Sequence, residues 1–166
     1  KKVLVVDIGG GTSDCSFVQM GPSFRDNACR NADFLSHTGK RIGGNDLDIA
    51  LAFHELTDLL GRDDKFKSGL PMPNQLFWQA CKINDLQMQS DFYSDKNHRD
   101  LNAMLREIEQ PERLRRLIKV QENKLSHRLV RQAELMKIAL STDSQSHCDM
   151  GFIGKDLAKL ITDAQL

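Results

Sequence analysis

Several features that mark other classes of protein are missing from this sequence of 166 residues. It has no Cys-x-x-Cys pair, its five histidines lack the spacing of zinc ligands, and no segment is apolar enough to span a bilayer or serve as a signal peptide. Lys plus Arg and Asp plus Glu both number 23, so no net charge attracts nucleic acid or an anionic membrane. The four cysteines are scattered along the chain, at Cys15, Cys29, Cys81 and Cys148. This distribution favours reduced thiols in a cytoplasmic protein.

What is present is ordinary for a globular protein with one core, or one core and a small annex. Hydrophobic residues make up 40% of the chain and charged residues 28%. Period-two patterns predict strands over 2–8, 14–20 and 31–37. A helix is then predicted from Asn45 or Asp46 up to Gly61. The pattern indicates an α/β fold with segregated parts: a small β-sheet followed by a mainly helical region.

Helical periodicity dominates the second half of the chain. Short helices are predicted over 76–83 and 101–108, whereas 85–97 is ambiguous. The segment 112–141 is the longest periodic stretch and keeps its apolar residues on one face. If it formed one continuous helix, that helix would be about 45 Å long. A turn and a strand edge are expected over 141–149, and a last helix over 155–164.

The most informative segment is a glycine turn between the first two predicted strands. Its residues are Asp7-Ile8-Gly9-Gly10-Gly11-Thr12-Ser13-Asp14. Glycines let the backbone approach a ligand closely, and the tip of such a hairpin offers N–H donors and hydroxyls to an anion. The flanking carboxylates suit a hydrated Mg²⁺, which prefers carboxylates, waters and phosphates. The turn therefore predicts phosphate binding, although an ordinary glycine hairpin is the alternative.

Two common phosphate motifs do not fit this segment. A Walker A loop requires Lys and Ser or Thr after its last glycine, and here Thr12-Ser13-Asp14 follows. A dinucleotide fingerprint requires a third glycine three residues after the second, and then a helix. Asp14 and a strand-like sequence stand there instead.

Two further segments place polar groups together. Gly43 and Gly44 precede a predicted helix, whose N-terminus is a natural seat for a phosphate or another anion. Glu134, Lys137 and Ser141 fall on one helix face at i, i+3 and i+7. Spacing alone also permits a routine Glu–Lys pair on a solvated helix.

These motifs, in this order, resemble those of the actin-like ATPases, and within them the Hsp70 chaperones. The Asp7–Asp14 turn resembles the second phosphate motif of that superfamily, and Gly43-Gly44-Asn45-Asp46-Leu47-Asp48 resembles an Hsp70 segment. The phrases around Ile42–Phe53, Gln89–Ser94 and Lys137–Ser141 are similar to bacterial YegD-type Hsp70-like proteins. The resemblance spans nearly the whole chain, although the region of about 60–128 is longer than in ordinary Hsp70s.

The resemblance implies binding of ATP or ADP with Mg²⁺. Catalytic roles would fall to Asp7, Thr12 and Asp14, with Asp7 and Asp14 holding the metal through water. Nucleotide contacts would come from Gly9, Gly10, Gly11, Thr12, Gly43, Gly44, Glu134, Lys137, Ile138 and Ser141. Ile138 stands where Hsp70s have an adenine-stacking Arg, so the cation–π component would be lost.

The resemblance also implies a domain arrangement. Residues 1–42 would be part of the base of the second lobe, and 43–166 its outer subdomain, with an enlarged helical region over about 60–128. The first phosphate loop and the adenosine loop of the family are not in this sequence, so we expect a fragment of a longer ATPase that is inactive alone. Such a site needs its phosphates and attacking water held from both sides.

Two other functions stay open at this point. A sugar or acid kinase of the same superfamily would share the phosphate turn. A non-catalytic module is the other possibility, because exchange factors grip the outer subdomain of Hsp70s and the region of about 60–128 offers a partner surface. The simpler interpretation of those extra helices is that they thicken the core.

Overall fold

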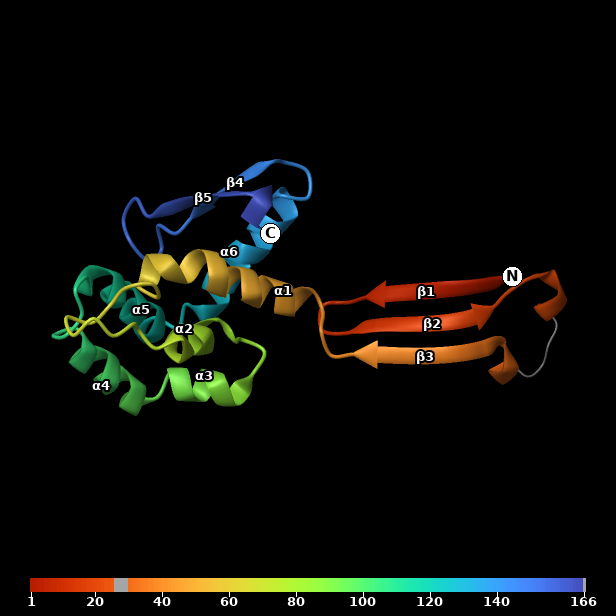
Figure 1. The fold of residues 1–166 in the computed structure, drawn as a ribbon, viewed down its shortest axis with the longest axis horizontal. Helices are drawn as coiled ribbons and strands as arrows, with labels where there is room; N and C mark the ends of the chain where they lie inside the picture. The colour runs from red at the N-terminus through yellow and green to blue at the C-terminus, as the bar shows by residue number, and fades with distance from the viewer. Residues whose placement is uncertain (26–29, 166) are drawn as a thin grey trace. The chain divides into compact units, whose positions relative to one another are not determined.

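A computed structural model describes residues 1–25 and 30–165, so Cys29 lies outside the described residues. The chain divides into two compact units, Lys1–Leu47 and Asp48–Leu166 (Figure 1). The first unit contains three strands and the second contains mainly helices, which confirms the mixed α/β fold. Within the described residues no helix has the length and apolar character needed to cross a membrane.

The first unit is built on a three-stranded antiparallel sheet in the order β1-β2-β3. Its strands are β1 (Lys2–Ile8), β2 (Ser13–Gln19) and β3 (Phe34–Lys40). The first two match the predicted strands to within one residue. The third starts later than predicted because Asn31–Asp33 forms a 3-10 turn instead.

Both faces of this sheet carry apolar side chains. Leu4, Val6 and Ile8 alternate with Val5 along β1, and all four are exposed. Among the described side chains of this unit, only Val18 and Asp33 are buried. The sheet therefore buries few side chains by itself. Apolar residues on both faces are typical of strands that are covered on both sides.

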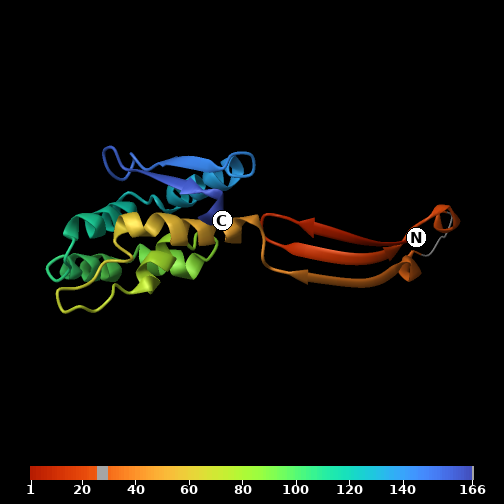
Figure 2. The ribbon, with the colours of Figure 1, turned by 45° about the horizontal axis from the view of Figure 1, so that its top comes forward.

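The second unit begins within α1 (Gly44–Leu51), which continues as a π-helical turn Ala52–Leu56 and a 3-10 turn Thr57–Leu60. Gly61 ends this segment with a φ of 100°, a left-handed conformation that glycine adopts without strain. The elements that follow are α2 (Asn74–Cys81), α3 (Leu86–Phe92), α4 (Asp95–Met104), α5 (Pro111–Glu122), α6 (Ser126–Ala139), β4 (Gln145–Asp149) and β5 (Ala158–Thr162). Strand β4 lies along α6, as Figures 1 and 2 both show.

The core of the chain lies in this second unit. Its fully buried side chains come from every helix between α1 and α6, and the larger ones include Ile49, Leu56, Phe77, Phe92, Leu101, Leu117, Leu129 and Met136. The additional helices of 60–128 contribute Phe77, Phe92 and Leu101 to that core. Their apolar faces thus pack inward, in agreement with the simpler interpretation of this region.

The periodic segment 112–141 does not form one continuous helix. Helix α5 ends at Glu122 and α6 begins at Ser126. Between them Lys124 has a φ of 52°, which a right-handed helix cannot accommodate. The shared apolar periodicity of the two helices arises because both pack on the same core, and not because they are continuous.

The predicted last helix over 155–164 is also wrong. Ala158–Thr162 forms β5 and pairs with β4 in antiparallel register, with Ile161 opposite Ser146. Ile161 is buried and its neighbour Leu160 is exposed, which is the alternation of a strand. Pairing with β4, a non-local contact, overrides the weak helical pattern.

Smaller differences occur between α2 and α5. The ambiguous stretch 85–97 forms α3 and the start of α4. Asp85 and Ser94 cap these two helices through side-chain oxygens that accept from Met88 N and Asn97 N. Helix α4 therefore begins at Asp95, six residues before the predicted helix over 101–108.

Candidate functional site

The first glycine turn joins β1 to β2 and presents free backbone donors. Gly9 N donates to Thr12 O at 2.8 Å, which closes the turn. No hydrogen bond within 1–25 and 30–165 uses the N–H groups of Gly10, Gly11 or Thr12. A Cβ built on Gly11 would meet nothing within 4 Å, so the turn is open to a ligand at that position.

The second glycine turn packs directly against the first. Gly44 N donates to Gly9 O at 2.9 Å, and Asn45 N donates to Gly10 O at 2.8 Å. Gly43 is buried, and a Cβ there would lie 2.5 Å from Gly11 N and 2.6 Å from Gly9 O. Glycine is therefore needed at position 43 because two backbones meet there.

This packing uses the donors of the second turn. Gly43 N donates to Asp46 Oδ2 at 3.1 Å, and Gly44 N is bonded to the first turn. The structure thus gives Gly43 and Gly44 a role in supporting the first turn. Their contact with a phosphate stays a prediction.

The two carboxylates of the motif face each other across the strands. Asp7 on β1 pairs with Asp14 on β2 in direct register, so their side chains leave the same face of the sheet. Like charges placed directly opposite destabilise a sheet, and a cation between them would relieve this cost. The pair thus fits a hydrated Mg²⁺, although no cluster of three or more potential metal ligands occurs among the residues that the structure describes.

Two residues that the sequence analysis did not select surround Asp14. A Cβ on Gly39 would lie 2.3 Å from Asp14 Oδ1, so Gly39 on β3 makes room for this carboxylate. His37 Nε2 lies 3.9 Å from Asp14 Oδ1, and His37 Nδ1 is 2.9 Å from Ser16 Oγ. The signal for both was the strand alternation, which places His37 and Gly39 on one face of β3.

The predicted nucleotide contacts of the second unit lie along α6 and just after it. Lys137 Nζ is 2.7 Å from Asp48 Oδ1, and Glu134 Oε2 is 2.5 Å from Arg131 Nη1. Ile138 is exposed, whereas Ser141 follows the helix and donates from Oγ to Lys137 O at 3.0 Å. Glu134 and Lys137 thus present one acceptor and one donor group that are already charge-compensated by the protein.

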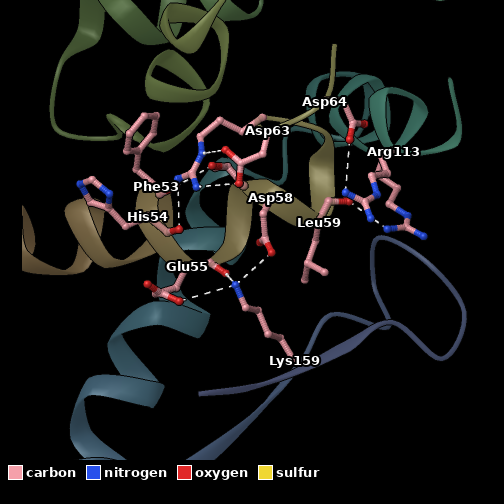
Figure 3. A network of polar contacts seen from close by, with 12 residues as sticks. Phe53, His54, Glu55, Asp58, Leu59, Asp63, Asp64, Arg113 and Lys159 are labelled. Atoms are coloured by element: carbon pink, nitrogen blue, oxygen red, sulfur yellow. Dashed lines mark hydrogen bonds and ion pairs between the residues drawn. The ribbon is translucent and has the colours of Figure 1, made fainter. Parts of the chain in front are cut away.

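A second polar cluster supports the π-helical turn of this unit (Figure 3). Lys159 Nζ reaches Glu55 O and Asp58 Oδ2, the latter at 3.0 Å. Arg62 donates to the carbonyls of Phe53 and His54. In a π-turn some backbone carbonyls lack the partner that a regular α-helix would give them, and here cationic side chains donate to these carbonyls. The cluster therefore has a structural role.

Two adjacent carboxyls in this cluster have pKa values shifted in opposite directions. Hydrogen bonding from Arg62 lowers the pKa of Asp63, and burial opposes this shift without reversing it. Burial raises the pKa of Asp64, and the nearby charge of Arg113, whose Nη1 lies 3.2 Å from Asp64 Oδ1, opposes this only in part. The ionised form is thus favoured at Asp63 and disfavoured at Asp64.

We expect Asp63→Asn and Asp64→Asn to change stability with opposite signs at pH 7. The stabilisation from Asp63 is present above its ordinary pKa of 3.8 and is lost as the pH falls through its lowered value. Because Asp63 forms its ion pair at the surface, removing its charge costs less than about 1 kcal/mol. The penalty from Asp64 is present above its raised value and disappears as the pH falls toward 3.8, so a neutral isostere raises the free energy of unfolding. Urea unfolding of both variants at pH 7 and pH 4 measures this, and equal losses for both would contradict it.

No model of a known protein family matches the chain. A function for it is therefore proposed from its residues and from their geometry.

Proposed function

We propose that this chain supplies one side of an ATP site in an Hsp70-like member of the actin-like ATPases. The single observation that supports this most is the Gly9–Thr12 turn, which has unpaired N–H donors and lies between carboxylates in direct register. Unpaired donors at a hairpin tip suit phosphate oxygens. The carboxylates suit the metal that accompanies those phosphates.

Each group has a defined task in this proposal. The N–H groups of Gly10, Gly11 and Thr12 bind phosphate oxygens, while Asp7 and Asp14 orient the waters around the metal. Mg²⁺, when bound, neutralises charge on the phosphates. Glu134 and Lys137 contact the ribose, and the exposed Ile138 packs on the base.

The proposal assigns hydrolysis to a longer protein and not to this chain alone. Phosphoryl transfer depends on positioning and on charge stabilisation from all sides of the phosphate. The motifs of this chain resemble those of the second lobe of the family alone, so we expect weak nucleotide binding and no phosphate release above the blank. Micromolar or tighter binding of ADP to the chain would contradict this part of the proposal.

Gly11→Ala tests the phosphate site directly. A Cβ at position 11 meets no protein atom within 4 Å, so the fold is unaffected, but the methyl group stands where a phosphate would approach. Titration with Mg-ADP, followed by amide NMR, is expected to shift Gly10, Gly11 and Thr12 in the natural chain. The variant is expected to bind about tenfold more weakly, a change of about 1.4 kcal/mol.

Two additional measurements complete this test. Asp7→Asn is expected to remove the dependence of these shifts on Mg²⁺, because the metal shell loses one charge. The strand amides of β1 report whether the fold is kept in each variant. Absence of any ADP-dependent shift at the turn would refute the phosphate site.

A further inference from the structure

The turn that joins β4 to β5 is contacted by basic side chains from two helices. Lys119 on α5 donates from Nζ to Ile153 O at 2.9 Å. Arg128 on α6 places its guanidinium carbon 4.4 Å from the centroid of the Phe152 ring, as in a cation–π contact. Two neighbouring residues of this turn therefore each have a cation beside them.

Two more cations lie at the next positions of the turn. A Cβ built on Gly154 would lie 3.9 Å from Arg116 Nε, and Arg116 Nη1 donates to Leu59 O at 2.9 Å. Lys155 follows Gly154 in the chain and is exposed. These four cations together are called the basic turn surface, which consists of Arg116, Lys119, Arg128 and Lys155.

The charges of the basic turn surface are not neutralised by carboxylates. Among the residues that the structure describes, none of the four cations forms an ion pair. Carbonyl oxygens and an aromatic ring hold three of them, and such groups restrain a side chain without cancelling its charge. Other arginines of α5 differ in this respect, because Arg113 pairs with Asp64 and Arg115 pairs with Glu112.

The acidic residues of the same turn leave this positive charge in excess. Asp149 Oδ1 accepts a hydrogen bond from Gly151 N at 2.8 Å, and Asp156 is exposed. The four cations outnumber these two carboxylates. Several hydrogen-bond donors also remain for a ligand, because a guanidinium has five and an ammonium has three.

The arrangement of these cations favours a ligand with several separated carboxylates. They lie beside successive residues of the turn and do not converge on one point, as donors to a single phosphate would. An extended peptide presents alternate side chains about 7 Å apart along one face. The chain has a formal net charge of zero, so no long-range field draws a nucleic acid to it.

We propose that the basic turn surface binds an extended acidic peptide segment of a protein partner. This inference goes beyond the proposed ATP site and does not depend on it. Two of the four cations come from α5, within the region of about 60–128 that is longer than in ordinary Hsp70s, so the resemblance does not supply this surface. Cations that are already restrained lose less side-chain entropy when a partner binds.

The test is a titration of the chain with a peptide of four Glu-Thr repeats, followed by amide NMR. The signals of Phe152, Ile153 and Gly154 are expected to shift and to saturate by about 1 mM peptide. A peptide of four Gln-Thr repeats is expected to shift none of them. Binding is expected to weaken as the salt concentration rises, because salt screens exposed charges.

Three lysine variants locate the binding on the surface. Lys119→Gln and Lys155→Gln are each expected to weaken binding of the Glu-Thr peptide about fivefold. The matched control is Lys96→Gln, which removes the charge of an exposed lysine on α4 and is expected to leave the affinity within about twofold. If Lys119→Gln disturbs the turn through Ile153, Lys155→Gln decides the test, because this exposed side chain has no hydrogen bond within the described residues.

Several outcomes would overturn the inference. These are equal shifts with both peptides, equal weakening in Lys155→Gln and Lys96→Gln, or tighter binding at this turn of pyrophosphate, an oligonucleotide or phosphatidylserine vesicles. Failure of the proposed function shows elsewhere, as the absence of Mg-ADP shifts at the Gly9–Thr12 turn. The two proposals can therefore fail independently.

Discussion

Gly43→Ala is expected to separate the two glycine turns and to destabilise the first unit by about 3 kcal/mol. The new Cβ would lie 2.5 Å from Gly11 N, 2.6 Å from Gly10 C and 2.6 Å from Gly9 O. All three are backbone atoms, so no side chain can rotate away, and the cost falls at the upper end of that for overpacking. The hydrogen bonds from Gly44 N to Gly9 O and from Asn45 N to Gly10 O would lengthen or break.

Amide hydrogen exchange measures this effect at the affected bonds. Exchange at Gly44 and Asn45 is expected to accelerate about 100-fold, which corresponds to about 2.7 kcal/mol of local stability. Gly11→Ala is the matched control, because a Cβ there meets nothing within 4 Å and leaves exchange unchanged. Exchange in Gly43→Ala equal to that in the control would show that the turns do not pack as described.

Phe92→Ala is expected to lower the free energy of unfolding of the second unit by about 3–5 kcal/mol. The Phe92 ring is fully buried at the end of α3, and its centroid lies 5.1 Å from that of Tyr93. Removal of a buried ring loses its transfer free energy and leaves a cavity. Helix α3 has only seven residues, too few to be stable without tertiary packing, so the loss also loosens the helix.

Urea unfolding followed by circular dichroism and by Trp78 fluorescence measures this loss. The matched control is Leu86→Ala at the start of the same helix, where the side chain is 87% exposed. We expect the control to change stability by less than about 0.5 kcal/mol. Similar losses in the two variants would contradict the burial of Phe92.

Local sequence patterns were sufficient for the first two strands. Val3–Val6 and the glycines define a hairpin through nearest neighbours along the chain. They were insufficient at Lys124, where a single residue with a positive φ divides a periodic segment in two. They also failed over Ala158–Thr162, because the nearest paired residues of β4 and β5, Asp149 and Ala158, are already nine positions apart in the chain.

The residues of the candidate site also divide into those that the sequence made recognisable and those that only the structure brought together. Asp7, Asp14 and the glycines between them were recognisable because they are adjacent in sequence. His37, Gly39 and Asp48 were missed as members of the site, because their contacts depend on the pairing of β2 with β3 and on the packing of α1 near α6. Their signals in the sequence are single residues without a motif.

The sequence by itself determined the first two strands, the glycine turn between them and the balanced charge of this protein. Those features depend on residue type and on spacing over a few positions. Only the tertiary structure decided that Gly43 packs on Gly9–Gly11, that Asp14 lies over Gly39, and that Asp48 holds Lys137. The physical reason is that steric exclusion and charge compensation act between atoms that the chain brings together only when it folds.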